Sequence, residues 1–430
     1  MSEVHNQQQI QKCVVSFSHD RYDSREKTTR LAIAKARGEI KARKKGISHL
    51  ILRARDDSID QLKFLFLIHG IPIVCYAMEN LLNSSLKEIV VVGSPEVEHV
   101  LESYLDTVGS NGKKVTFLRE DLENLSLLNT LALGRSKLHL ESDEMILFQP
   151  GDLPFMYDIE KVLKDPDLEN FNLILWLNSR HKMFSRFMDE PDSEFVQRNY
   201  HYRGIIEEEN ELHEIKEPNI YPINLKAVES DIIEYLHSSR KDGNILKAGF
   251  KKALGMPIRL LRLIPVLTYH IMNFRSDLKQ FRKSDSYQFG MHRDNFHRGA
   301  SILLNTEFTT KFHDDPAFVS DVDALEDWED FEALTHHAHT LYGEEGLSNI
   351  HPKGDELMEF RERSMPGLKK KLPMYADFPA YINNLYRELD MGYVPFDTEG
   401  NFISAKNSGT VKHAFNWYSA KCGTLKVKSE

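Results

Sequence analysis

The chain has 430 residues, which is more than one compact core usually holds, so we expect two or three domains. Hydrophobic residues make up 41% and charged residues 28%, as in globular rather than disordered or fibrous proteins. With 55 Lys and Arg against 65 Asp and Glu, the formal net charge is −10. Such a chain is not expected to bind nucleic acid non-specifically, although a local basic pocket can still bind a small anion.

The cysteines and the apolar segments indicate the cellular compartment in which the protein is expected. Cys13, Cys75 and Cys422 are far apart and odd in number, so we expect neither a disulfide framework nor a zinc knuckle. The N-terminus lacks the apolar stretch of a signal peptide, and no run reaches the roughly 18 apolar residues of a membrane span. We therefore expect a cytoplasmic protein without a transmembrane segment.

The first half of the chain changes character at residue 46. Residues 1–45 are polar and then basic, and we expect a basic N-terminal helical arm there. Apolar strands then alternate with amphipathic helices. Strands are expected at 48–54, 86–93, 113–120 and 144–155, and helices after the GIP turn at 70–72, at 95–108 and at 126–138. This alternation predicts a mainly parallel sheet with helices on both faces, which binds ligands at the carboxyl ends of its strands.

The second half is less regular. A strand is expected at 172–180, a hairpin with an extended segment at 199–225, and a turn opening a helix at 319–334. Between them we expect a helical insertion at 228–300. Its segment GMPIRLLRLIPVLTYHIMNFR carries Arg259 and Arg262, and we interpret it as a core helix with solvent-reaching arginines rather than a membrane-surface helix. Residues 46–335 form the expected α/β domain, and residues 336–430 a C-terminal extension of unknown role.

The strongest candidate site residue is Asp152. It lies in PGDLPF, directly after the apolar run MILFQ, and so at the ligand-binding edge of the expected sheet. A carboxylate there can hold a magnesium ion that bridges phosphate oxygens. Gly151 lets the chain turn sharply, and Pro154 fixes the exit. Taken alone, the pattern fits an ordinary strand-end turn equally well.

A second acidic feature is SDVDALED at 320–327. Asp321 and Asp323 are two residues apart, so one can point into a site while the other caps the following helix. Taken alone, capping and the helix dipole explain both residues better than a ligand site does. Together with Asp152 they favour a metal site, because carboxylates distant in sequence often share one magnesium ion.

Four stretches in order resemble the nucleotidyltransferases of the sugar-phosphate and molybdenum-cofactor type, the MobA-like NTP transferases. They are LKFLFLIHGIPIVCYAMENLLNSSLKEIVVVG (62–93), SLLNTLALG (126–134), ILFQPGDLPF (146–155) and SDVDALEDW (320–328). HEIKEPNIYPIN (213–224) also resembles the substrate segment of these enzymes. The resemblance spans about two thirds of the chain.

The resemblance implies a Rossmann-like, GT-A-like nucleotidyltransferase fold, with a mixed, mainly parallel sheet flanked by helices. It implies transfer of an NMP from an NTP to a small phosphorylated acceptor, such as a sugar, polyol or cofactor phosphate, with release of pyrophosphate. The implied cofactor is Mg²⁺; no nucleic acid is implied, and a homo-oligomer is left open. The implied roles are nucleotide binding for Lys63 and Asn129, catalysis for Lys63 and Asp152, metal binding for Asp152 with Asp323 or Asp321, and acceptor binding for Lys216, Glu217 and Asn219.

The chain departs from the family in its first loop. The family pattern is roughly LAGGxGxRMG, and this chain has the glycine-free LRARDDSID instead. Side chains would crowd a turn that has to approach the β- and γ-phosphates closely. Either Arg53 and Arg55 replace those contacts, or the fold serves as a non-catalytic binding or assembly module. A nucleotide-sugar glycosyltransferase with an acidic metal motif is a weaker alternative.

Overall fold

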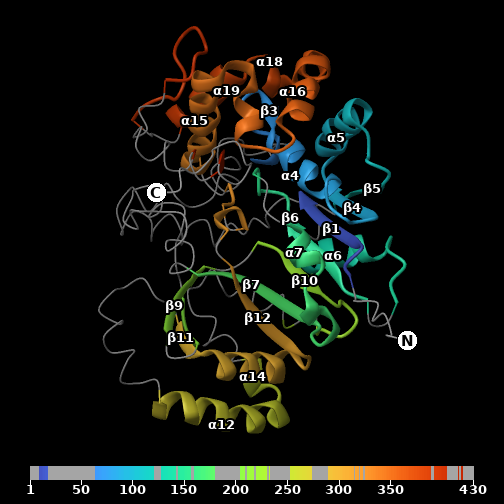
Figure 1. The fold of residues 1–430 in the computed structure, drawn as a ribbon, viewed down its shortest axis with the longest axis vertical. Coiled ribbons are helices and arrows are strands. Elements are labelled where there is room, and N and C mark those ends of the chain that lie inside the picture. The colour runs from blue at the N-terminus through green and yellow to red at the C-terminus, as the bar shows by residue number, and fades with distance from the viewer. Residues whose placement is uncertain are drawn as a thin grey trace, which may run out of the picture.

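The computed structural model describes the parts of the chain that form its sheet and helical layers. These are residues 9–17, 63–120, 127–141, 144–155, 159–179, 204–208, 211–216, 219–229, 232, 252–273, 289–313, 315–318, 320–322, 325–388, 392–403, 415, 418 and 419. Their arrangement is shown in Figure 1.

A long mixed sheet runs through the described residues. Its path is β11-β8-β9-β7-β10-β6-β1-β4-β5, and β12 pairs with β7. The strands are β1 (Lys12–Phe17), β4 (Glu88–Gly93), β5 (Lys114–Arg119), β6 (Ile146–Pro150), β7 (Leu173–Ser179), β8 (Gly204–Glu208), β9 (Glu211–Lys216), β10 (Tyr221–Ile223), β11 (Phe289–His292) and β12 (Phe308–His313). Five of the described pairings are parallel and four are antiparallel. The expected fold class is therefore confirmed.

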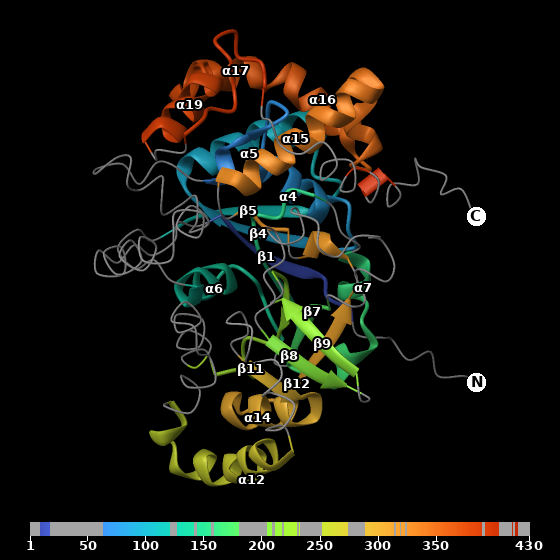
Figure 2. The same ribbon diagram turned by 90° about the vertical axis from the view of Figure 1, so that its left-hand side faces the viewer.

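Helices cover both faces of the parallel part of the sheet (Figure 2). They are α4 (Ile73–Leu82), α5 (Pro95–Val108), α6 (Leu127–Arg135) and α7 (Ile159–Leu163), with 3₁₀ turns η1 (Lys63–Leu65) and η2 (Pro166–Glu169). Residues of β1 alternate between the two layers: Val14 belongs to the apolar cluster that includes Leu131 of α6, whereas Val15 belongs to the cluster that includes Val97 of α5. A strand buried on both faces reads as an apolar run, as the buried Cys13–Val15 segment of β1 does.

The region after residue 324 forms a helical layer over the hairpin of β2 (Leu67–Ile68) and β3 (Ile71–Pro72) (Figure 1). It consists of α15 (Leu325–Tyr342), η5 (Gly343–Asn349), α16 (Gly354–Arg363), α17 (Met365–Lys371), α18 (Pro373–Ala376) and α19 (Phe378–Glu388). Trp328 of α15 is fully buried, and its indole N–H donates to the Leu67 carbonyl at 2.7 Å. Phe360 of α16 packs edge-on against Tyr104 of α5, with ring centroids 5.2 Å apart, so the C-terminal extension is packed against the core of the α/β domain.

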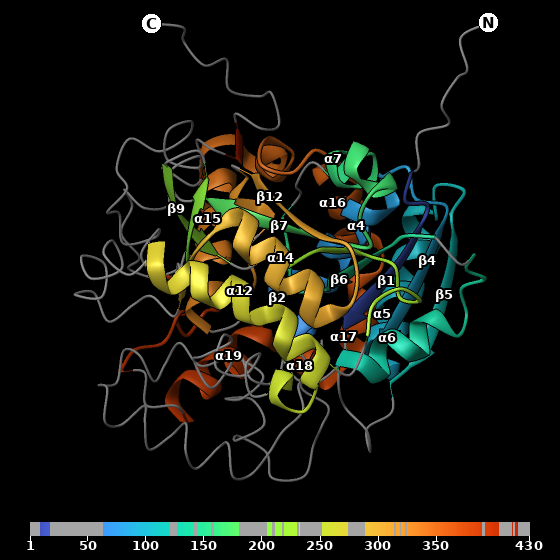
Figure 3. The same cartoon turned by 90° about the horizontal axis from the view of Figure 1, so that it is seen from below.

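The opposite end of the molecule carries α12 (Pro257–Asn273) and α14 (Arg293–Leu304), which lie side by side (Figure 3). The turn η4 (Pro316–Phe318) follows β12 and returns the chain to the sheet. None of the described helices combines the length and the apolar content needed to cross a membrane.

Two sequence predictions need correction. Residues 12–17, assigned to the basic arm, form β1, an interior strand of the sheet between β4 and β6. The region 228–300 is not wholly helical, because β11 pairs in parallel with β8. The expected strand at 48–54 lies outside the described residues, and the remaining domain boundaries stay predictions.

Candidate active site

The tight turn that follows β6 packs against the carboxyl end of β1. The Gly151 N–H donates to the Ser16 carbonyl at 2.7 Å, which brings the PGDLPF turn against the last residues of β1. A Cβ on Gly151 would lie 2.1 Å from ring atoms of Phe17, which is fully buried. Glycine is therefore required at this position by close packing, and the turn holds Asp152 at the sheet edge.

Lys63 and Asp152 form a buried ion pair at this edge. Lys63 Nζ lies 2.5 Å from Asp152 Oδ2, and each residue is only 7% exposed. Phe64, the next residue, packs edge-on against Phe17 with ring centroids 5.5 Å apart, which fixes η1 beside β1. The two residues for which a catalytic role is predicted are thus brought together in space.

A second lysine–aspartate pair lies next to the first. Lys216, the last residue of β9, places its Nζ 3.2 Å from Asp321 Oδ1. The neighbouring Val322 N–H donates to the Asp152 carbonyl at 3.0 Å. This backbone bond ties the two acidic segments together, as expected for one site. Each lysine charge faces a carboxylate, so the cluster as described is close to neutral.

The described residues do not by themselves complete a magnesium site. No group of three or more His, Cys, Asp or Glu side chains suited to a metal ion occurs among them. Asp152 engages Lys63 through one oxygen, and Asp323 lies outside the described residues. Metal binding at Asp152 with Asp321 or Asp323 therefore stays a prediction.

The other predicted site residues are placed as follows. Asn129 is exposed on α6. Asn219 is partly buried, and its N–H donates to the Phe318 carbonyl at 3.3 Å, which places the start of β10 beside the segment that leads to Asp321. Arg53, Arg55 and Glu217 lie outside the described residues.

Sequence reasoning missed Asn178 near the end of β7. Asn178 is fully buried and pairs across the strands with Lys216 of β9. Its side-chain amide donates to the Asp315 carbonyl at 3.4 Å, so it links β7 to the segment that leads to Asp321. The polar NSR directly after the apolar run NLILWL is a signal that could have identified it.

Comparisons with known proteins give only loose similarities. No protein-family model matches the chain, and no curated protein matches it. Among solved structures it is similar to a hypothetical transferase from Thermus thermophilus, with 14% identity, a TM-score of 0.39, and coverage of 74% of this chain and 99% of the other. It is also similar to the inositol-1-phosphate CTP transferase of T. maritima, with 12% identity, a TM-score of 0.31, and coverage of 55% and 76%. A third is the 4-diphosphocytidyl-2C-methyl-D-erythritol synthase of Anaerococcus prevotii, with 7% identity, a TM-score of 0.35, and coverage of 76% and 97%. Overlaps this loose do not establish a family for the chain.

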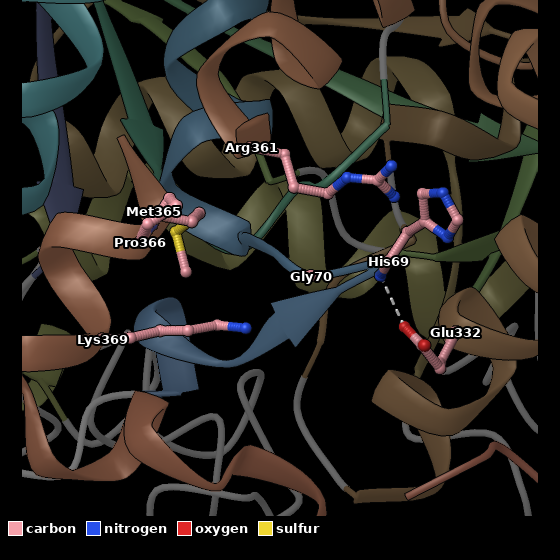
Figure 4. A pocket seen from close by; sticks show the side chains of 7 residues that line it. All are labelled: His69, Gly70, Glu332, Arg361, Met365, Pro366 and Lys369. Atoms are coloured by element: carbon pink, nitrogen blue, oxygen red, sulfur yellow. Dashed lines mark hydrogen bonds between the residues drawn. The ribbon is translucent and has the colours of Figure 1, made fainter. Parts of the chain in front are cut away.

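A pocket of about 390 Å³ lies between the β2–β3 turn and the C-terminal helices (Figure 4). It is lined by His69, Gly70, Glu332, Arg361, Met365, Pro366 and Lys369, none of which was predicted as a site residue. The His69 N–H donates to Glu332 Oε2 at 2.6 Å. Burial, with smaller effects from Arg361, His339 and His336, lowers the pKa of His69 to about 3. The imidazole is therefore neutral near pH 7, and Arg361 and Lys369 supply the positive charge of the pocket.

Glu332 is expected to make the stability of the protein depend on pH. Burial raises the pKa of its carboxyl from 4.5 to about 7, against the opposing effect of the His69 N–H. A raised folded-state pKa means that the folded state holds the proton more tightly, so stability is lost as the pH rises from about 4.5 through about 7. Glu332→Gln keeps an acceptor for His69 without the charge. We expect its free energy of unfolding relative to wild type to rise by about 2 kcal/mol between pH 5 and pH 8.

Urea unfolding at the two pH values measures this difference. The matched control is Glu345→Gln, at an exposed position in η5, whose effect is expected to be the same at both pH values. A Glu332→Gln effect that does not change with pH would show that the carboxyl titrates normally.

Proposed function

We propose that the protein is a nucleotidyltransferase that joins an NMP from an NTP to a small phosphorylated acceptor and releases pyrophosphate. One observation carries the proposal. The Lys63–Asp152 and Lys216–Asp321 ion pairs lie at one sheet edge, and the hydrogen bond from the Val322 N–H to the Asp152 carbonyl connects them. Two cations and two carboxylates at the carboxyl ends of parallel strands suit a reaction between two phosphates.

The reaction needs little covalent chemistry from the protein. An oxygen of the acceptor phosphate attacks the α-phosphorus, a new P–O bond forms, and the bond to the β-phosphate breaks with pyrophosphate as the leaving group. Both reactants are anionic, so catalysis consists of holding them together and neutralising their charge. We assign charge neutralisation on the nucleotide to Lys63 and on the acceptor to Lys216. Mg²⁺, with Asp152 and Asp323 as its proposed ligands, would neutralise phosphate charge when bound.

The roles of the two lysines can be separated by binding measurements. Lys63→Met is expected to weaken NTP binding by about 10- to 100-fold, because a charge-assisted hydrogen bond contributes about 1.5–3 kcal/mol. Lys216→Met is expected to weaken binding of the phosphorylated acceptor by a similar factor and to leave NTP binding nearly unchanged. Isothermal titration of each ligand against each variant gives the four affinities.

Lys12→Met is the matched control for these titrations. Lys12 is also a partly buried lysine in an ion pair, with Glu144 at 2.8 Å, but it lies at the opposite end of β1. Its replacement is expected to change neither affinity. Equal NTP affinity in wild type and Lys63→Met would remove Lys63 from the nucleotide site.

A non-catalytic binding module is the second candidate, and two observations favour it. Lys63 Nζ already lies 2.5 Å from Asp152 Oδ2 without a ligand. In addition, the sequence that follows β1, SHDRYDSREK, contains no glycine, and the first glycine after it is Gly38. Nucleotide binding to the wild-type protein without pyrophosphate release, over all four NTPs and an acceptor panel, would support this second candidate.

A further inference from the structure

The outer face of α12 is an apolar surface to which the proposed function assigns no role. Four large apolar side chains are exposed on this helix: Ile258 is 75% exposed, Leu261 67%, Ile264 49% and Tyr269 49%. Leu254, just before the helix, is 56% exposed. Single exposed apolar side chains are normal on a soluble protein, but a contiguous group of this size marks an interaction site.

The inner face of α12 fixes the helix to the molecule. Leu263 and Val266 are buried against Ile302 of α14. Arg259 donates to the Leu303 carbonyl at 3.0 Å and forms an ion pair with Glu229. The helix is therefore apolar on both sides, and the interpretation of this segment as a core helix is wrong for its outer side.

The position of α12 allows a planar surface to contact the helix along its whole length. Figures 1 and 2 show it at one tip of the long axis of the molecule, running across that tip and farthest from the C-terminal helices. Leu263 and Val266 are on the side of α12 that packs toward α14, and helical spacing places the exposed Ile258, Leu261 and Ile264 on the other side. A helix of this length is about 25 Å long, so a plane can contact the whole outer face at once.

The sequence in and around α12 is basic. Residues 243–275 contain six Lys and Arg and no Asp or Glu, in a chain whose net charge is −10. Among them Arg262 is exposed, and helical spacing places it beside Ile258 on the edge of the apolar face. Exposed apolar side chains flanked by basic ones are the signature of a helix that lies in the headgroup region of a membrane.

We propose that the outer face of α12 docks the protein on a bilayer surface that contains anionic lipid. The apolar side chains enter the boundary between headgroups and acyl chains, and Arg262 contacts lipid phosphates. A second copy of this chain suits the surface less well. The exposed apolar area is on the order of 600 Å², which is less than the roughly 800 Å² that each partner contributes to a stable dimer.

Vesicle flotation with the full-length protein tests the proposal. We expect the wild type to float with phosphatidylcholine vesicles that contain about 30% phosphatidylglycerol, and to float several-fold less with pure phosphatidylcholine. Ile258→Ser with Leu261→Ser is expected to reduce flotation on anionic vesicles at least tenfold. Arg262→Glu is expected to reduce it about tenfold, because each basic residue near an anionic surface contributes a factor of about five.

The matched control is Leu341→Ser. Leu341 is 53% exposed, but it lies on α15 in the C-terminal helical layer. Its replacement removes a comparable apolar side chain from a different surface, and flotation is expected to stay at the wild-type level. Thermal unfolding confirms that all variants remain folded.

Four results would overturn the proposal. The first is that the wild-type protein does not float with anionic vesicles, and the second is that it floats equally well with neutral and anionic vesicles. The third is that the Ile258→Ser/Leu261→Ser variant floats as well as the wild type. The fourth is that the wild type is a dimer in solution and that this variant is a monomer. The last result would assign the surface to a second copy of the chain.

Discussion

Asp152→Asn is expected to lower turnover by more than about a hundredfold, which corresponds to about 2.7 kcal/mol of barrier. The amide keeps the size of the carboxylate but loses the charge that we propose for metal binding and for holding Lys63. Pyrophosphate release per unit time, measured at saturating NTP and acceptor, gives the ratio. Turnover near the wild-type level would show that neither the metal nor Lys63 depends on this carboxylate.

The structure adds a stability effect to this substitution. Lys63 and Asp152 are both buried, so removing one charge leaves the other without its ion-pair partner, at a cost of about 3 kcal/mol in the free energy of unfolding. The fold is therefore expected to survive with reduced stability rather than unchanged. The loss of turnover has to be measured well below the unfolding midpoint.

A double variant separates the two effects. Lys63→Met with Asp152→Leu replaces the pair by apolar side chains of similar volume, and such replacements are often neutral or stabilising. We expect its stability to return to within about 1 kcal/mol of wild type while turnover stays lost. Recovery of turnover together with stability would show that the pair is structural only.

Gly151→Ala is expected to destabilise the protein by about 3 kcal/mol or more. The new methyl group would lie 2.1 Å from ring atoms of Phe17, a fully buried side chain with no free space to move into. Overpacking of this kind forces shifts in both the ring and the backbone. Because Asp152 is the next residue, the shift should also displace its carboxylate from Lys63.

The free energy of unfolding in urea measures the effect of Gly151→Ala. Gly367→Ala is the matched control, because no neighbouring atom lies within 4 Å of the position of the new Cβ on α17. Alanine inside a helix is expected to be neutral or slightly stabilising there. Equal stabilities for the two variants would mean that β1 and the PGDLPF turn are not packed as described.

Local signals predicted the regular elements of the α/β domain well. Helix α5 begins with Ser94, whose hydroxyl accepts from the Val97 N–H, followed by Pro95 in the first turn, and both are start signals written in the sequence. β1 was missed because its six residues form one short apolar run beside polar sequence, and their strand character comes from pairing with β4 and β6. Such pairing is set by tertiary contacts that local patterns do not contain.

The sequence singled out the four residues of this cluster but not how they pair. Lys63, Asp152, Lys216 and Asp321 were all named from their segments, yet which lysine faces which carboxylate depends on how β9, η1 and the two acidic turns meet. Asp321 illustrates the difficulty, because its sequence context favours helix capping whereas its carboxylate faces Lys216. The helices after residue 335 were hidden by a polar composition, which is normal for helices that bury one face only.

Pyrophosphate release is the most direct test of the central claim. The wild-type protein is incubated with Mg²⁺, each of the four NTPs, and a panel of sugar and polyol phosphates, and Asp152→Asn and Lys12→Met are assayed beside it. We expect pyrophosphate release for at least one pair of NTP and acceptor, and we expect it to be lost in Asp152→Asn and kept in Lys12→Met. Release that persists unchanged in Asp152→Asn, or no release with any pair, would contradict the central claim.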